Sequence, residues 1–355
     1  MHNKKNAFDL LRILLAICVI IAHSYLIAGY KSQDPLVYFS KNQTNLGLFG
    51  VMGFFTISGY LITASFERSK SIFQFISHRV LRIFPGYWFC LLFTAFVITP
   101  ILFYLTQRSF NGFYLFGDDS ATSYIFKNFF LRINQWSINN VLAFAYHKNA
   151  INGSLWSLYA EVQCYCFTIV AGYFGLFNKN KNLYLVFFAT ILVFYSINTA
   201  LSKSYGPTLL ILSPALSLYP SYLAGSIIYT FRNHLILDKK GTIFLILFTL
   251  ALLKFGGFNL ISPFLIALSL INAFQLFEFK LKYDVSYGVY IYSFPLQQVL
   301  FQIFGTNLPV SLFIIVSILI SILLGLISYI FVEKPSINLG KINYLRVPII
   351  KQPLT

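Results

Sequence analysis

Two stretches decide the fold class: residues 10–28 read LLRILLAICVIIAHSYLIA, and residues 310–332 read VSLFIIVSILISILLGLISYIFV. Each is long enough to cross the apolar core of a membrane as a helix, which takes about 20 residues. Eight further apolar runs lie between them, near 47–66, 83–105, 155–177, 183–201, 208–231, 242–257, 259–278 and 286–304. The sequence therefore predicts an all-α, polytopic integral membrane protein with about ten transmembrane helices.

The composition agrees with this prediction. Of the 355 residues, 57% are hydrophobic and only 10% are charged, and the mean hydropathy is +0.72. A soluble domain usually carries about a quarter charged residues, so an ordinary soluble enzyme, a disordered chain and a disulfide scaffold are excluded. Ten membrane-spanning helices leave little of the chain for a separate soluble domain. We therefore expect one membrane-embedded domain over 1–355, with spans from about 10 to 332 and a cytoplasmic tail at 333–355.

The four cysteines give no sign of a metal site. All lie in apolar runs, and Cys164 and Cys166 are two residues apart, which on a helix points them to different faces. We expect neither a zinc site nor a structural disulfide, and no metal ion.

The distribution of basic residues predicts the orientation in the membrane. The net charge is +16, and with a cytoplasmic N-terminus and ten spans, 18 of the 26 Lys and Arg residues fall on the cytoplasmic side. This bias follows the positive-inside rule, so we expect both termini to be cytoplasmic and no nucleic-acid partner. The longest outer loop, at about 106–153, is rich in aromatic residues. It could stack on sugars or lie at the level of the lipid headgroups.

Sorting the ionisable residues by depth leaves one acid and one base well inside apolar runs. Of ten acidic residues only Glu161 lies there, and of five histidines only His23 does. An ionisable group in lipid costs at least a few kcal/mol, so each is a functional candidate. Counted at 1.5 Å per residue, both lie at similar depth in the outer half of the membrane. A packing histidine and a helix–helix hydrogen bond are the structural alternatives.

Helical spacing places further polar residues beside this pair. Asp9, Arg12 and His23 fall on one stripe of the first span, about 16 Å long from Arg12 to His23. A second polar stripe on the fourth span consists of Ser154, Ser157, Glu161, Tyr165 and Thr168. Ser154 is also the expected N-cap of that span. We predict one groove with a basic inner mouth and an acid–base pair near its outer end.

Two more arginines join the inner mouth. Arg79 and Arg82 are three residues apart, so they share a helix face beside Arg12. Forked guanidinium groups suit phosphate oxygens, although simple positive-inside anchoring is an alternative. A donor with phosphates at one end and a long thin arm, such as acyl-coenzyme A, fits a groove of this kind.

The ordered motifs resemble those of the membrane acyltransferase-3 family. The matching stretches are Phe8-Asp9-Leu10-Leu11-Arg12 leading to His23, Phe54-Phe55-Thr56-Ile57-Ser58-Gly59-Tyr60-Leu61-Ile62, Arg79-Val80-Leu81-Arg82-Ile83-Phe84-Pro85, Asn152-Gly153-Ser154-Leu155-Trp156-Ser157-Leu158 with Glu161 and Tyr165, Ser286-Tyr287-Gly288-Val289-Tyr290, and Val332-Glu333-Lys334-Pro335. The resemblance runs from about residue 7 to 336. It implies ten core helices and transfer of an acyl group, usually acetyl, from cytoplasmic acyl-coenzyme A to a hydroxyl of a surface glycan.

The family's essential residues map onto His23, Arg79, Arg82 and Glu161, with Asp9 and Arg12 near by. Supporting positions carried by the motifs are Ser154, Trp156, Tyr165 and Tyr287. The resemblance implies acetyl-coenzyme A as co-substrate, no permanently bound cofactor, and a place in the bacterial inner membrane.

We predict an O-acetyltransferase of a cell-surface polysaccharide, most favourably lipopolysaccharide O-antigen, with exopolysaccharide or capsule next. In this mechanism His23 is the general base and Glu161 orients it or binds sugar hydroxyls. The rival function is a transporter or flippase for a lipid-linked sugar, against which the absence of internal repeats counts.

Overall fold

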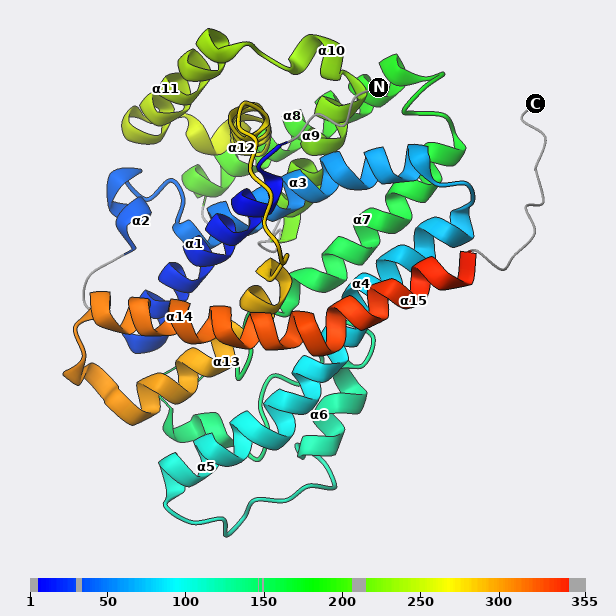
Figure 1. Cartoon of the computed structure of the whole chain (residues 1–355). Coiled ribbons are helices and arrows are strands. Elements are labelled where there is room, and N and C mark those ends of the chain that lie inside the picture. The colour runs from blue at the N-terminus through cyan, green and yellow to red at the C-terminus, as the bar shows by residue number, and fades with distance from the viewer. Residues whose placement is uncertain (1–5, 30–33, 146, 149, 206–214, 345–355) are drawn as a thin grey trace.

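The computed structural model describes residues 6–29, 34–145, 147–148, 150–205 and 215–344, which form helices and loops with no β-strand among them (Figure 1). The α-helices of the N-terminal half are α1 (Phe8–Ala28), α2 (Pro35–Phe39), α3 (Leu46–Arg68), α4 (Ile72–Phe93), α5 (Thr99–Gln107), α6 (Ala121–Asn128) and α7 (Trp156–Tyr173). Those of the C-terminal half are α8 (Lys181–Tyr205), α9 (Ala215–Thr230), α10 (Arg232–Leu235), α11 (Lys239–Phe255), α12 (Phe258–Gln275), α13 (Ser286–Phe304), α14 (Val310–Ser328) and α15 (Lys334–Tyr344). Two π-helical segments, η1 (Thr94–Ile98) and η4 (Tyr329–Glu333), and two 3₁₀ segments, η2 (Val141–Phe144) and η3 (Gly305–Asn307), complete the set.

The all-α prediction is confirmed for the described residues, and each of the ten predicted runs contains an α-helix. The run at 208–231 holds α9, while residues 206–214 lie outside the described part of the chain. Six helical stretches of the described chain are long and apolar enough to cross a membrane: Phe8–Ala28, Leu46–Arg68, Ile72–Gln107, Lys181–Leu201, Phe258–Gln275 and Val310–Gly340.

The third predicted span begins about three turns earlier than its apolar run. Ser71 caps α4 by accepting a hydrogen bond from the Gln74 N–H, so the helix starts at residue 72 rather than 83. It continues through η1 and α5 to Gln107. The π-helical segment lies just before Pro100, whose missing N–H interrupts the regular α-helical ladder. Arg79 and Arg82 are consequently held on a rigid helix.

The last predicted span also continues beyond its expected end at residue 332. The π-helical segment η4 joins α14 to α15, and the helix runs on to Tyr344 alongside the first half of α4 (Figure 1). Glu333 is the last residue of η4 and is fully buried. Single π-helical turns inside helices are frequent at functional sites.

Two glycines let α3 and α9 touch through their backbones. A Cβ added at Gly59 would overlap the carbonyl oxygen of Tyr222, and one added at Gly225 would overlap the carbonyl oxygen of Thr56. Small residues that permit such close approach are typical of helix pairs in membranes. The Thr63 and Ser226 hydroxyls, 2.6 Å apart, add a hydrogen bond to the same interface.

We expect Gly225→Ala to destabilise the folded protein. Alanine raises helix propensity by about 1 kcal/mol, but overpacking against a fixed backbone costs about 1–3 kcal/mol or more. Thermal unfolding in detergent should therefore occur at a lower temperature. The control is Ala251→Val on the exposed side of α11, which adds more volume and should leave the melting temperature unchanged. A melting temperature for Gly225→Ala at or above the wild-type value would contradict this interpretation.

The predicted stripe on α1 is confirmed by its contacts with the segment around α13. Arg12 near the start of α1 bonds to Asp284, and His23 packs against Phe294 ten residues farther along. The two helices therefore run in the same direction. Ala16 and Val19, between the two ends of the stripe, are buried.

The long loop at 106–153 folds back onto the end of the helix bundle near α5 and α6 (Figure 1). The Tyr87 hydroxyl donates to the Asn128 carbonyl, and the Trp88 ring nitrogen donates to the Phe129 carbonyl. The Trp88 and Phe129 rings stack at 4.8 Å. Phe116, Phe126 and Phe130 are exposed in the same region, which leaves both the sugar-stacking and the headgroup interpretation open.

Candidate functional site

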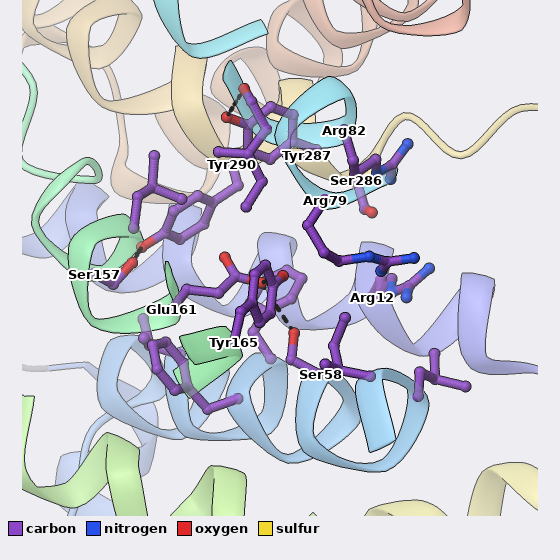
Figure 2. Close-up of a pocket in the computed structure, with 17 residues that line it drawn as sticks. Arg12, Ser58, Arg79, Arg82, Ser157, Glu161, Tyr165, Ser286, Tyr287 and Tyr290 are labelled. Atoms are coloured by element: carbon purple, nitrogen blue, oxygen red, sulfur yellow. Dashed lines mark hydrogen bonds between the residues drawn. The ribbon is translucent and has the colours of Figure 1, made fainter. Parts of the chain in front are cut away.

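The three arginines predicted at the inner mouth lie together in the wall of one cavity. Arg12 comes from α1, and Arg79 and Arg82 come from α4. Figure 2 shows their guanidinium groups at one end of the cavity. The predicted basic cluster is therefore present.

Asp284, which lies between two of the predicted spans, forms ion pairs with two of these arginines. Asp284 Oδ2 accepts from Arg82 at 2.6 Å and from Arg12 at 3.2 Å. Its other oxygen accepts from the Ser286 hydroxyl at 2.6 Å. Asp284 therefore ties α1, α4 and the start of α13 together at one point. Its partners are 272 and 202 residues away along the chain, so no local pattern reveals it.

A second carboxylate, Glu333, lies behind this contact. Its Oε2 is 3.7 Å from Arg82, and its Oε1 accepts from the Ser328 hydroxyl at 3.1 Å. It packs against Gly86 and Gly288, where any side chain would crowd it. Its place in the Val332–Pro335 motif was the only sequence signal. Asp9, predicted near this cluster, is 3.7 Å from Arg12.

Arg79 differs from the other two arginines. No carboxylate of the described chain lies within 4 Å of it, and its one hydrogen bond is a long contact of 3.4 Å to the Ser65 hydroxyl. Its Nε is buried without a partner. The side chain also borders three cavities at once. A buried donor without an acceptor costs about 1–3 kcal/mol, so Arg79 is the guanidinium best placed to bind an external anion.

Glu161 lies in the middle of the same cavity. Its Oε1 accepts from the Tyr165 hydroxyl at 2.5 Å and from the Ser58 hydroxyl at 3.0 Å (Figure 2). At the opposite end from the arginines, the Ser157 and Tyr290 hydroxyls form a hydrogen bond of 2.8 Å. The predicted polar face of the fourth span is therefore confirmed for Ser157, Glu161 and Tyr165.

A second cavity adjoins the first through the arginines. The walls of both contain Arg12, Arg79 and Arg82, and the second is also lined by His78 and Asp284. The cavity with Glu161 has a volume of about 120 Å³ and the second about 320 Å³. The two cavities therefore meet the same three guanidinium groups.

His23 is not among the residues that line either of these cavities. Its ring packs edge-on against Phe294 at 4.8 Å, which is four residues beyond Tyr290 on α13, a rise of about 6 Å. Glu161 has Ser58 and Tyr165 as its hydrogen-bond partners, and His23 is not among them. The predicted groove thus joins Arg12 to Glu161 but not to His23, and Glu161 does not orient His23 in this structure.

The remaining predicted residues have structural partners. The Tyr287 hydroxyl donates to the Ile83 carbonyl at 2.9 Å, which fixes α13 beside α4. Trp156 is part-buried against the main apolar core. The predicted cap by Ser154 is wrong, because α7 begins at Trp156 without a side-chain cap and the Ser154 hydroxyl is buried without a partner among the described residues. Within the described residues, no group of three or more His, Cys, Asp or Glu could hold a metal ion.

We expect Asp284→Asn to destabilise the protein at neutral pH. The variant should also lose less stability than the wild type when the pH is lowered. Burial alone would raise the pKa of Asp284, but the guanidinium groups of Arg82 and Arg12 outweigh it and lower the pKa to about 2. A carboxyl with a lowered pKa stabilises the fold by about 2 kcal/mol at neutral pH, and this contribution disappears as the pH falls from about 4 to 2.

The measurement is thermal unfolding of the wild type and Asp284→Asn in detergent across pH 7 to 2. The wild type should melt at the higher temperature at pH 7, and the two curves should converge near pH 2. A difference in melting temperature that stays constant down to pH 2 would show that the charge of Asp284 does not cause the extra stability of the wild type.

Comparison with known proteins identifies the family of this chain. A family model described as an acyltransferase domain (Acyl_transf_3) matches residues 5–330. An O-acetyl transferase of Shigella phage Sf6 is 30% identical over 308 residues, which is 84% of this chain and 86% of that protein. Nodulation protein 10 of Rhizobium leguminosarum bv. viciae is 39% identical over 82 residues, 23% of this chain and 22% of that protein. No solved structure matches. The family match over nearly the whole chain confirms the resemblance seen in the motifs: the chain belongs to the acyltransferase-3 family.

Proposed function

We propose that the protein is an O-acetyltransferase that moves an acetyl group from cytoplasmic acetyl-coenzyme A to a hydroxyl of a bacterial surface polysaccharide. The observation that carries this proposal is the pair of cavities that share Arg12, Arg79 and Arg82 in their walls, one of which also contains Glu161. Membership of an acyltransferase family supports acyl transfer, and the name of the Shigella phage relative supports acetyl as the group. Among acceptors we favour lipopolysaccharide O-antigen, with exopolysaccharide or capsule next.

The proposed donor suits the two cavities. The larger cavity on the side of His78 and Asp284 would take the phosphorylated end of acetyl-coenzyme A, and the smaller one the thin arm that carries the thioester. Arg79 would bind a phosphate directly, because it has no carboxylate partner among the described residues. Arg12 and Arg82 are fixed by Asp284 and would turn their remaining N–H groups to the same anion. The coenzyme serves as a co-substrate, and we propose no permanently bound cofactor.

For the reaction we propose that His23 is the general base. It takes the proton of the acceptor hydroxyl while the hydroxyl oxygen forms a bond to the thioester carbonyl carbon. The carbon–sulfur bond then breaks, His23 passes the proton to the sulfur so that coenzyme A leaves as the thiol, and the acetyl ester remains on the glycan. The Ser157–Tyr290 hydrogen bond lies at the end of the cavity away from the arginines, and we propose that this contact opens for the thioester to reach His23.

Glu161 has a different proposed role from the one expected of an orienting acid. Its hydrogen bonds hold Ser58 and Tyr165 in the wall of the cavity, between the arginines and the Ser157–Tyr290 pair (Figure 2). Because both hydroxyls donate their protons to the carboxylate, they would offer only their oxygen lone pairs to the arm of the donor. Binding of sugar hydroxyls by Glu161 is the second proposal for this residue, since carboxylates are strong acceptors.

We place the protein in the inner membrane with both termini in the cytoplasm. The positive-inside distribution of the Lys and Arg residues supports this orientation. It puts the arginine cluster on the side of the acyl-coenzyme A pool and the loop at 106–153 on the outer side. The transporter or flippase alternative gains no support from the comparisons. The two matches that cover most of this chain are an acyltransferase family and an O-acetyl transferase.

The experiment that tests the function in cells is mass spectrometry of the surface polysaccharide with and without the protein. We expect O-acetyl groups on the polysaccharide of producing cells and their loss in cells without the protein. A flippase would instead change the amount of surface polysaccharide and leave its acetylation unaltered.

A further inference from the structure

A second histidine lies beside the outer end of α1. The ring of His147, from the loop that precedes α7, packs edge-on against Phe294 at 5.7 Å. His23 packs edge-on against the same ring at 4.8 Å. Two imidazoles from segments 124 residues apart therefore share one aromatic neighbour on α13, and both are only partly buried.

The central ring is fixed from several directions. Phe294 is only 2% exposed and belongs to the apolar cluster at this end of α13. Gly153 lies directly against the ring, and any side chain there would meet it, with the nearest contact at 2.5 Å. Phe294 consequently forms a rigid surface against which the two histidines are held.

The loop carrying His147 is docked onto α13 by amide side chains. Gln298 donates to the carbonyl oxygens of His147 at 3.2 Å and Ala150 at 2.9 Å. At the other end of the contact, Asn152 donates to the Ile291 carbonyl at 2.8 Å. Because buried amides on both sides bind backbone groups, the position of His147 is set by the fold and not by chance packing of a loose loop.

The two imidazoles have free hydrogen-bonding capacity. The Nδ1 of His23 is buried and has no partner in the described chain. Burial lowers the pKa of His147, so at neutral pH its ring is uncharged and offers one donor and one acceptor. A pair of neutral imidazoles matches the needs of a sugar hydroxyl, which both donates and accepts.

We propose that His147 is an acceptor-binding residue, and that a sugar hydroxyl of the glycan lies between His147 and His23 against the face formed by Phe294. This rests on the proposed acyl transfer. His23 takes the proton of the attacking hydroxyl, as above, and His147 hydrogen-bonds the same sugar and positions it. No proton is transferred to His147, and the bonds that form and break are those of the proposed reaction.

The kinetic test uses the full-length protein in proteoliposomes with acetyl-coenzyme A. The acceptor is the surface polysaccharide of the producing cells after mild alkali has removed its ester groups. We expect His147→Ala to raise the KM for polysaccharide about tenfold, as the loss of one hydrogen bond predicts, and to leave the KM for acetyl-coenzyme A unchanged. His147→Gln, which keeps an acceptor and a donor, should recover part of the loss.

The matched control is Lys148→Ala, the exposed neighbour of His147 on the same loop. It should leave both KM values unchanged. Equal acceptor KM values in wild type and His147→Ala would overturn the proposal, and so would a rise of both KM values together, because that would indicate a general loss of structure.

A binding test does not depend on catalysis. Diethyl pyrocarbonate modifies accessible imidazoles, and the modified residues are found by peptide mass spectrometry. We expect the polysaccharide to slow modification of His23 and His147 together, with His234 on α10 as the unprotected reference. Protection of His23 alone, or of neither residue, would overturn the role of His147. Absence of acetyl transfer by the wild type would contradict the proposed function instead, and the labelling result would still decide the site.

Discussion

Replacement of His23 by alanine is expected to lower the rate of acetyl transfer by about 10²–10⁴-fold while the protein inserts and folds normally. Removal of a general base typically has an effect of this size, because a neutral hydroxyl is a poor nucleophile. His23 makes an edge-on ring contact with Phe294, and its Nδ1 has no hydrogen-bond partner among the described residues, so its loss should leave the fold intact. The measurement is the transfer rate at saturating donor and acceptor, with melting temperature as the test of folding.

The control for this prediction is His234→Ala on α10, an exposed histidine outside the cavities. It should retain the wild-type rate. A His23→Ala protein that transfers acetyl groups at near the wild-type rate would remove the general base from the mechanism. His23→Gln should be as inactive as alanine, because glutamine cannot accept the proton.

Replacement of Arg79 by alanine is expected to weaken the binding of acetyl-coenzyme A by about 10–150-fold. A charge-assisted hydrogen bond contributes about 1.5–3 kcal/mol, and each 1.4 kcal/mol is a factor of ten in affinity. The effect should exceed that of Arg12→Ala or Arg82→Ala, because Asp284 already neutralises part of those two charges. Lysine at position 79 should restore only part of the affinity, since it lacks the planar fork.

Isothermal titration of the purified variants with coenzyme A measures this effect without the reaction. Arg232→Ala is the control, since its guanidinium lies over the Tyr229 ring outside both cavities. Equal coenzyme A affinity in wild type and Arg79→Ala would refute the phosphate site. A larger loss of coenzyme A affinity in Arg82→Ala than in Arg79→Ala would show that the arginine paired with Asp284, and not Arg79, binds the phosphate.

The residues that the sequence placed correctly were those on a single helix. The spacing of Arg12 and His23 predicted a common face of α1, and both indeed meet the segment from Asp284 to Phe294. The pair Arg79 and Arg82 likewise shares one face of α4. Helical periodicity alone determines which residues share a face of one helix. The arrangement of the neighbouring helices does not change this.

The pairing of His23 with Glu161 could not be predicted in the same way. Residue counts along two helices give the depth of each side chain but not which helices are neighbours. In the structure α3 packs on α1 and also on α7, and Ser58 of α3 takes the place beside Glu161 that the sequence assigned to His23. The depth argument was thus insufficient, because a third helix separates the two.

Asp284 and Glu333 were missed for a related reason. Each lies at the end of an apolar run, where charged residues usually face solvent, and the arginines that they contact are distant in the sequence. The buried position of Glu333 depends on the π-helical turn η4, which has no sequence pattern that distinguishes it from a regular helix end. The shape of the candidate site therefore became visible only with the tertiary structure.

The most direct test of the central claim is transfer of radiolabelled acetyl from acetyl-coenzyme A to polysaccharide by the purified protein in proteoliposomes. The account predicts that label appears on the alkali-treated polysaccharide as an alkali-labile ester, and that His23→Ala and Arg79→Ala greatly reduce it. Movement of polysaccharide across the bilayer with no label incorporated would contradict the account and would identify the protein as a carrier instead.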